Sequence, residues 1–159
     1  MHLRILLATA VFMTLCLAGC QATPSANTQA GSQKTRPVTA AEAAENRERP
    51  FKEAQIALEE YRCGTGSSEA VLAKISELEK HARIFTAIGS YSYADTAREH
   101  HTTVAFAFAE EAIKKGDLDA ADQVYRRLIE FYVGSAYAGI RDRARLGIDD
   151  IREARRGTK

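Results

Sequence analysis

Histidine is the residue type in this sequence with the widest range of possible chemistry. The 159 residues contain four: His2, His81, His100 and His101. Adjacent residues on a helix point about 100° apart, so His100 and His101 cannot easily share one metal ion. There is no His-Glu-x-x-His, no paired Cys-x-x-Cys and no carboxylate cluster at ligand spacing, so we expect no metal site. We expect His101, on an apolar stripe, to be a packed and hydrogen-bonded core residue, and we interpret His81 in the same way.

Motifs for phosphate binding and nucleophilic catalysis are also missing. Gly64-Thr65-Gly66-Ser67 superficially suggests a phosphate loop, but it lacks the preceding strand, the lysine and the required spacing. We therefore interpret it as a connection between helices. No Gly-x-Ser-x-Gly occurs, so the hydrolase elbow is absent. We predict a protein that is not an enzyme, with no cofactor and no evident small-molecule substrate; an enzyme or small-ligand binder using His100 or His101 is the third alternative.

The three cysteines are Cys16, Cys20 and Cys63, an odd number that forbids a fully paired intramolecular disulfide framework. Cys16 lies inside an apolar leader, and Cys20 follows directly after it. After one positive charge at Arg4, the 14 residues Ile5–Ala18 carry no charge. This length fits the hydrophobic region of a secretory signal, and it is too short for a transmembrane helix, which needs about 20 residues.

At the end of the leader stands Leu17-Ala18-Gly19-Cys20, which resembles the lipobox of bacterial lipoproteins: Leu, a small residue, Gly or Ala, then Cys. The resemblance implies cleavage before Cys20, transfer of diacylglycerol to its thiol and acylation of the new amine. Several acyl chains together anchor a protein effectively permanently, whereas one chain binds only marginally. Gln21 stands after Cys20 in place of Asp, which by the family's sorting rule in enteric bacteria favours the outer membrane. An ordinary secretory signal that happens to end in Cys is the alternative.

The chain is predicted to have three parts: a signal peptide over residues 1–19, the lipidated Cys20 with a flexible linker over residues 20–38, and a helical domain over residues 39–159. Residues 21–38 contain no acidic or aromatic residue and only one aliphatic residue larger than Ala. They cannot bury enough apolar surface to offset the entropy of ordering. As a flexible coil, this tether would span about 23 Å.

Composition and charge are those of an ordinary globular domain, with 45% hydrophobic and 27% charged residues and a net charge of +1. Removing residues 1–19 removes one base, Arg4, and no acid, and so leaves 21 bases and 21 acids. Without a basic field, nucleic-acid binding by simple electrostatics is not expected. Residues 141–159 carry seven bases against four acids. We interpret them as a solvated helix face with i,i+3 and i,i+4 pairs, the alternative being a docking patch for an acidic partner.

From Thr39 onward the apolar residues recur with the period of a helix and almost never alternate as in a strand. Thr39 and Glu42 have the form of a capping box, and Pro50 is expected to end, restart or kink the first helix. The fold class is therefore all-α, with five main helices in antiparallel hairpins joined by loops of two to six residues. Tyr91 and Tyr93 are interpreted as packing anchors, the alternative being exposed tyrosines at an interface. The predicted inner faces contain Phe51, Ala54, Leu58, Tyr61, Val71, Ile75, Leu78, Ala82, Phe85, Ala97, His101, Val104, Phe108, Ala112, Ala121, Val124, Tyr125, Leu128, Phe131 or Tyr132, Tyr137, Ile140, Ala144, Ile148 and Ile151.

Residues Ala105–Val133 resemble one tetratricopeptide repeat, a 34-residue helix hairpin. The most specific part is Gly116–Ala121, in which the family's Gly-Asp turn joins the two helices and a small residue lets them pack closely. The sequence departs from the family in lacking its Trp, in having Ala112 in place of a Tyr, and in having Val133 in place of the closing Pro. No second clean copy lies 34 residues upstream, and a generic antiparallel helical bundle is the alternative.

Together the two resemblances imply a lipid-anchored scaffold or adaptor of the cell envelope, at the outer membrane and facing the periplasm. Its tetratricopeptide-like domain would bind an envelope protein, for example during assembly of an outer-membrane, secretion or pilus complex. The sequence does not identify the residues that bind the partner. The alternative is a compact structural or immunity-type lipoprotein without a peptide-binding groove.

Overall fold

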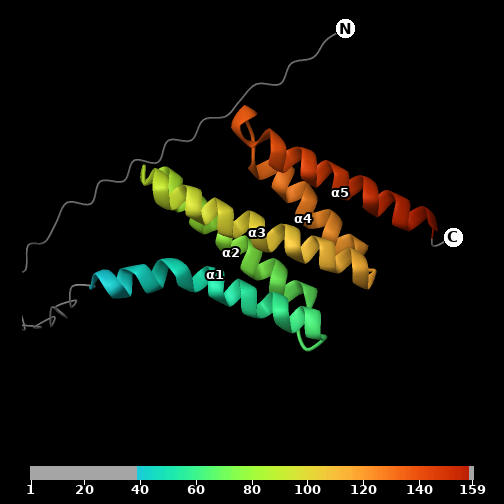
Figure 1. Cartoon of the computed structure of the whole chain (residues 1–159), viewed down its shortest axis with the longest axis horizontal. Coiled ribbons are helices and arrows are strands. Elements are labelled where there is room, and N and C mark those ends of the chain that lie inside the picture. Colours follow the sequence, from blue (N-terminus) through green and yellow to red (C-terminus); the bar gives the residue numbers. More distant parts are fainter. Residues whose placement is uncertain (1–38, 158–159) are drawn as a thin grey trace, which may run out of the picture. The chain divides into compact units, whose positions relative to one another are not determined.

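The computed structural model describes residues 39–157, and over this range it is all-α, as predicted. The helices are α1 (Ala40–Cys63), α2 (Ser68–Ala87), α3 (Tyr91–Lys115), α4 (Leu118–Phe131), the short 3₁₀ helix η1 (Ser135–Tyr137) and α5 (Ala138–Gly157) (Figure 1). The predicted signal peptide, Cys20 and the linker up to residue 38 lie outside the described residues, so those assignments stay predictions. None of the described helices is long and apolar enough to span a membrane.

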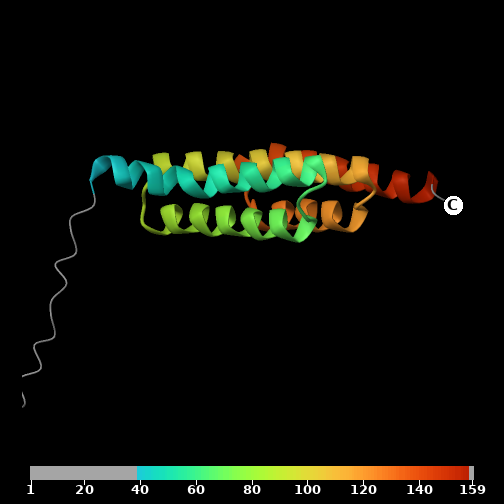
Figure 2. The same ribbon diagram turned by 90° about the horizontal axis from the view of Figure 1, so that it is seen from below.

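The five α-helices form two layers. Helices α1, α3 and α5 lie in one layer, and α2 and α4 lie in the other (Figure 2). Connections of two to six residues make neighbours along the chain antiparallel. Helix α3 is central, because it contacts all four of the other α-helices.

Helix α1 begins where the sequence predicts it. The Thr39 hydroxyl accepts a hydrogen bond from the Glu42 backbone N–H at 3.2 Å, and a Glu42 carboxylate oxygen accepts one from the Thr39 N–H at 2.8 Å. This reciprocal pair is the capping box. Pro50, however, does not end the helix, which continues through it to Cys63. Residues on both sides of Pro50 hold α1 on α3: Arg47 lies over the Tyr93 ring, and Phe51 stacks on His100.

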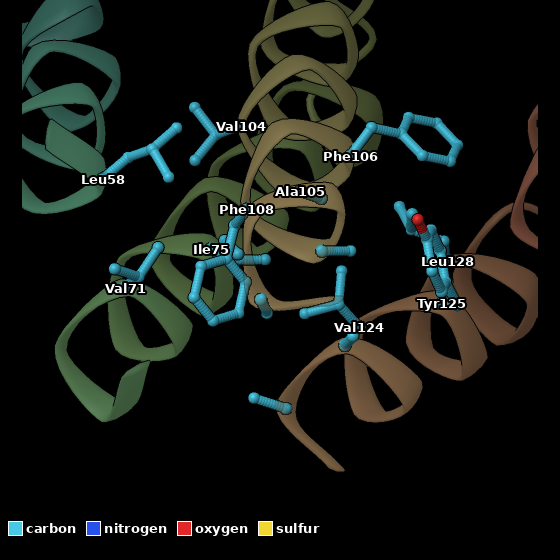
Figure 3. Close-up of a cluster of buried hydrophobic side chains, with 14 of the residues drawn as sticks. Leu58, Val71, Ile75, Val104, Ala105, Phe106, Phe108, Val124, Tyr125 and Leu128 are labelled. Atoms are coloured by element: carbon cyan, nitrogen blue, oxygen red, sulfur yellow. The ribbon is translucent and has the colours of Figure 1, made fainter. Parts of the chain in front are cut away.

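The predicted inner faces are confirmed as the core. The buried members are Ala54, Leu58, Tyr61, Val71, Ile75, Leu78, Ala82, Ala97, His101, Val104, Phe108, Ala112, Ala121, Val124, Tyr125, Leu128, Tyr132, Ala144, Ile148 and Ile151. The other predicted residues are only partly buried: Phe51, Phe85, Phe131, Tyr137 and Ile140. The single stripe predicted for α3 is too narrow, because Ala105, Phe106 and Ala109 are buried as well. Figure 3 shows Phe106 and Phe108 leaving α3 in different directions, as expected for a helix packed on several sides.

Candidate partner-binding groove

His101 is a core residue, as predicted, with 1% of its surface exposed. Its Nδ1 lies 3.0 Å from the Tyr132 hydroxyl oxygen, and that oxygen lies 3.2 Å from the Arg98 backbone carbonyl. A carbonyl only accepts, so the single hydroxyl proton points to Arg98, and Nδ1–H of His101 must be the donor to Tyr132. Burial lowers the pKa of His101 to about 4, which keeps this imidazole neutral near pH 7.

His81 and His100 lie together, a juxtaposition the sequence did not predict. They line a pocket of about 170 Å³ between α1, α2 and α3. His100 stacks on Phe51 with ring centroids 3.9 Å apart, and its Nε2 is 3.9 Å from a carboxylate oxygen of Glu48. His81 is only half-buried, with its ring edge against Phe85, so the prediction that it is a core residue is wrong. Burial lowers its pKa, and the nearby His100 lowers it further. Among residues 39–157 no group of three or more His, Cys, Asp or Glu side chains could hold a metal ion.

Glu79 is a buried carboxylate on α2 that binds two arginines. One of its oxygens accepts hydrogen bonds from Arg83, the shorter at 2.9 Å, and the other accepts one from Arg127 of α4 at 2.5 Å. Burial opposes ionisation of Glu79, but the hydrogen bonds and charges of the two arginines outweigh it and lower its pKa. The ionised Glu79 therefore fixes the positions of the Arg83 and Arg127 guanidinium groups.

These arginines belong to a hollow surface between α2 and α4. Two pockets of about 390 and 430 Å³ meet where the Arg83 guanidinium lies 4.7 Å from the centre of the Phe131 ring. One pocket is mainly charged, and the other is mainly aromatic and aliphatic. We call the whole surface the α2–α4 groove, lined by Glu79, Arg83, Thr86, Ala87, Arg98, Gln123, Arg126, Arg127, Glu130, Phe131, Tyr132, Val133 and Tyr137.

Large apolar side chains are exposed at and near this end of the domain. Val133, in the groove lining, is 69% exposed, and Ile84 and Ile88 of the α2 region are more than half exposed. Tyr91, the first residue of α3, is 73% exposed, so the prediction that it is a packing anchor is wrong. Tyr93 contacts Phe85 and Arg47 but is 43% exposed, so the prediction holds for it only in part. Exposed apolar residues that gather in one region mark interaction surfaces more often than scattered ones do.

The basic C-terminal segment is a paired helix face, which is the interpretation made from the sequence. Arg143 and Arg155 reach Glu110 of α3 and Asp119 of α4, while Arg145 and Arg152 pair within α5. Arg141 donates to the backbone carbonyls of Tyr132 and Gly134 after the end of α4. These contacts agree with the interpretation as a solvated helix face and do not test the alternative of a docking patch for an acidic partner.

Comparisons of the chain with protein-family models, with curated proteins and with solved structures found no match. Function is therefore inferred from the residues and their geometry. The groove residues come from separate parts of the sequence, and three of them, Phe131, Tyr132 and Tyr137, are among the residues predicted for the core. No local signal marked the groove, because α2 has a single arginine, Arg83, and a helical pattern alone assigns Arg126 and Arg127 of α4 to the solvent.

Proposed function

We propose that the protein is a lipid-anchored adaptor of the bacterial cell envelope that binds a protein partner in the α2–α4 groove. The observation that carries the proposal is the groove itself, an open hollow with fixed guanidinium groups beside aromatic side chains. Arginine and aromatic residues supply much of the binding energy at protein interfaces. The lipobox sequence ending at Cys20 supports a membrane anchor on the same chain.

The helix arrangement supports a repeat-like scaffold. Gly116 joins α3 to α4 in a left-handed conformation, with φ of 79°, and Ala121 is fully buried where the two helices meet. Stacked helix hairpins bury a continuous core and leave extended faces available for partners. A compact structural or immunity-type lipoprotein, the alternative, needs no such hollow, and the exposed Val133 in the groove has no role in it.

Site-specific crosslinking tests the proposed function. A photo-crosslinking amino acid replaces Val133 in the full-length lipidated protein. The variant is expressed in the native host, where the natural partner is present. Leu146 on α5 is the matched control, because it is 65% exposed, close to the 69% of Val133, and does not line the groove. We expect a discrete protein adduct from position 133 that position 146 does not give. Equal adducts at both positions, or none at position 133, would contradict the proposal.

A further inference from the structure

We infer that the α2–α4 groove takes an acidic chain segment, which places a carboxylate on Arg83 and an apolar side chain against Phe131 and Tyr137. The inference rests on the proposed function, since it specifies the chemistry of the segment that the adaptor binds. It depends on three features of the groove: its local charge, the unused donors of Arg83 and the apolar pocket beside them.

The groove carries a local positive charge at the junction of its two pockets, where Arg83 and Arg127 share the single carboxylate of Glu79. Its lining contains four arginines and two glutamates, and no carboxylate lines the pocket formed by Val133 and Tyr137. Glu79 is buried and already accepts hydrogen bonds on both oxygens, so it is compensated within the domain. Arg98 and Arg126 pair with Asp95 and Asp122, so these two arginines add no excess charge. The one excess positive charge of Arg83 and Arg127 around Glu79 favours an acidic segment and disfavours a basic one.

Arg83 is placed to bind a carboxylate. Its Nε and Nη2 both donate to Glu79, which orients the guanidinium plane, while Nη1 has no acceptor within residues 39–157. The side chain is 63% exposed and lies over the Phe131 ring. A guanidinium fixed in this way keeps donors for a partner and loses little conformational entropy on binding. Arg98 is different, because it is mostly buried and donates to Asp95 and Thr86.

The apolar pocket next to Arg83 gives the segment a second requirement. It is lined by Phe131, Tyr132, Val133 and Tyr137, together with Ala87 of α2. The part of α2 that lines the whole groove runs from Glu79 to Ala87, a rise of about 12 Å at 1.5 Å per residue. An extended segment covers that distance with about four residues. A short stretch that combines acidic residues with an aromatic or large aliphatic residue fits both halves of the groove.

An array of random octapeptides, probed with the purified full-length lipidated protein in detergent, tests this inference. We expect the bound peptides to be enriched in Asp and Glu next to Leu, Ile or Phe. A selected peptide should lose affinity by about tenfold or more when its acids become amides, the ratio expected for one charge-assisted hydrogen bond. Binding should also weaken as salt is added.

Two variants locate the binding in the groove. Arg83→Gln should remove the preference for acidic peptides, whereas Arg145→Gln should keep it, because Arg145 is similarly exposed and paired but lies on α5 outside the groove. Arg83→Gln also takes a partner from Glu79, so Val133→Glu provides an independent variant that leaves this pair intact. Its added carboxylate at the exposed rim should repel acidic peptides.

Each outcome of these experiments decides the inference. Bound peptides without acidic enrichment, or an acidic preference that survives both Arg83→Gln and Val133→Glu, would overturn it. So would binding to phosphatidylglycerol vesicles that depends on the same residues while the array shows no acidic preference. If crosslinking at Val133 succeeds and the array shows no such preference, the proposed adaptor function stands and only the acidic chemistry of its partner is refuted.

Discussion

At the scale of single residues, His101 makes the stability of the fold depend on pH. The folded chain holds its pKa at about 4, below the ordinary value of 6.5, because burial disfavours the charged imidazolium. Between these two values the unfolded chain binds a proton that the folded chain does not. The free energy of unfolding therefore falls as the pH falls through this window, by about 2 kcal/mol between pH 6.5 and pH 5 at about 1.4 kcal/mol per pKa unit.

His101→Gln tests this linkage, since an amide can still donate a hydrogen bond to Tyr132 but does not titrate. Urea unfolding measured from about pH 5 to about pH 7 should show a clearly flatter pH dependence for the variant than for the natural chain. His81→Gln is the comparison variant: the pKa of His81 is also lowered, but His81 is only half-buried, so the slope should change in the same direction and by less. An unchanged slope in His101→Gln would contradict the buried neutral imidazole.

At the scale of elements, the contact between α4 and α5 depends on Gly147. A Cβ atom at this position would lie 2.3 Å from two ring atoms of Tyr125, which is itself buried. The ring would have to move within a packed core, so Gly147→Ala should destabilise the domain by about 1–3 kcal/mol. Gly139→Ala makes the same chemical change in the same helix, where a Cβ meets nothing within 4 Å. That variant should be neutral or stabilising by up to about 1 kcal/mol.

Thermal and urea unfolding of these two variants measure the difference directly. A Gly147→Ala protein as stable as the natural chain would contradict the close approach of α4 and α5. The sequence carried a signal for this contact, because a glycine inside a helical pattern often has a packing reason. It could not name Tyr125 as the cause, since periodicity shows which side of a helix faces inward but not which side chain it meets.

The same physical limit explains what else the sequence could and could not predict. The stripe Val71, Ile75 and Leu78 was predictable because burial repeats with the helix period. Glu79, next to that stripe, was not: a charged residue in a helix is ordinarily exposed, and its partner Arg127 lies 48 residues away. Continuation of α1 through Pro50 likewise depends on contacts with α3 that no local pattern contains. The groove was missed because it consists of such contacts between distant segments.

At the scale of the whole molecule, the proposed adaptor needs a folded domain and an anchor that act together. The domain holds its groove by internal pairs, chiefly Glu79 with Arg83 and Arg127. Nothing in those pairs requires the membrane, so the groove should keep its structure whether or not the chain is lipidated. The anchor would confine the groove to the envelope and raise its effective concentration near an envelope partner.

The anchor is predicted to depend on Cys20 alone, and the chain provides its own control. Cells fed radioactive palmitate should label the natural protein, and Cys20→Ala should abolish the label because the thiol that receives diacylglycerol is gone. Cys63→Ala should keep the label, since Cys63 is a free, exposed cysteine at the end of α1, outside any lipobox pattern. Label that persists in Cys20→Ala, or is lost in Cys63→Ala, would refute the lipoprotein assignment. Because the groove would be intact in all three proteins, a Cys20→Ala chain that still binds acidic peptides would show that anchoring and partner binding are separable.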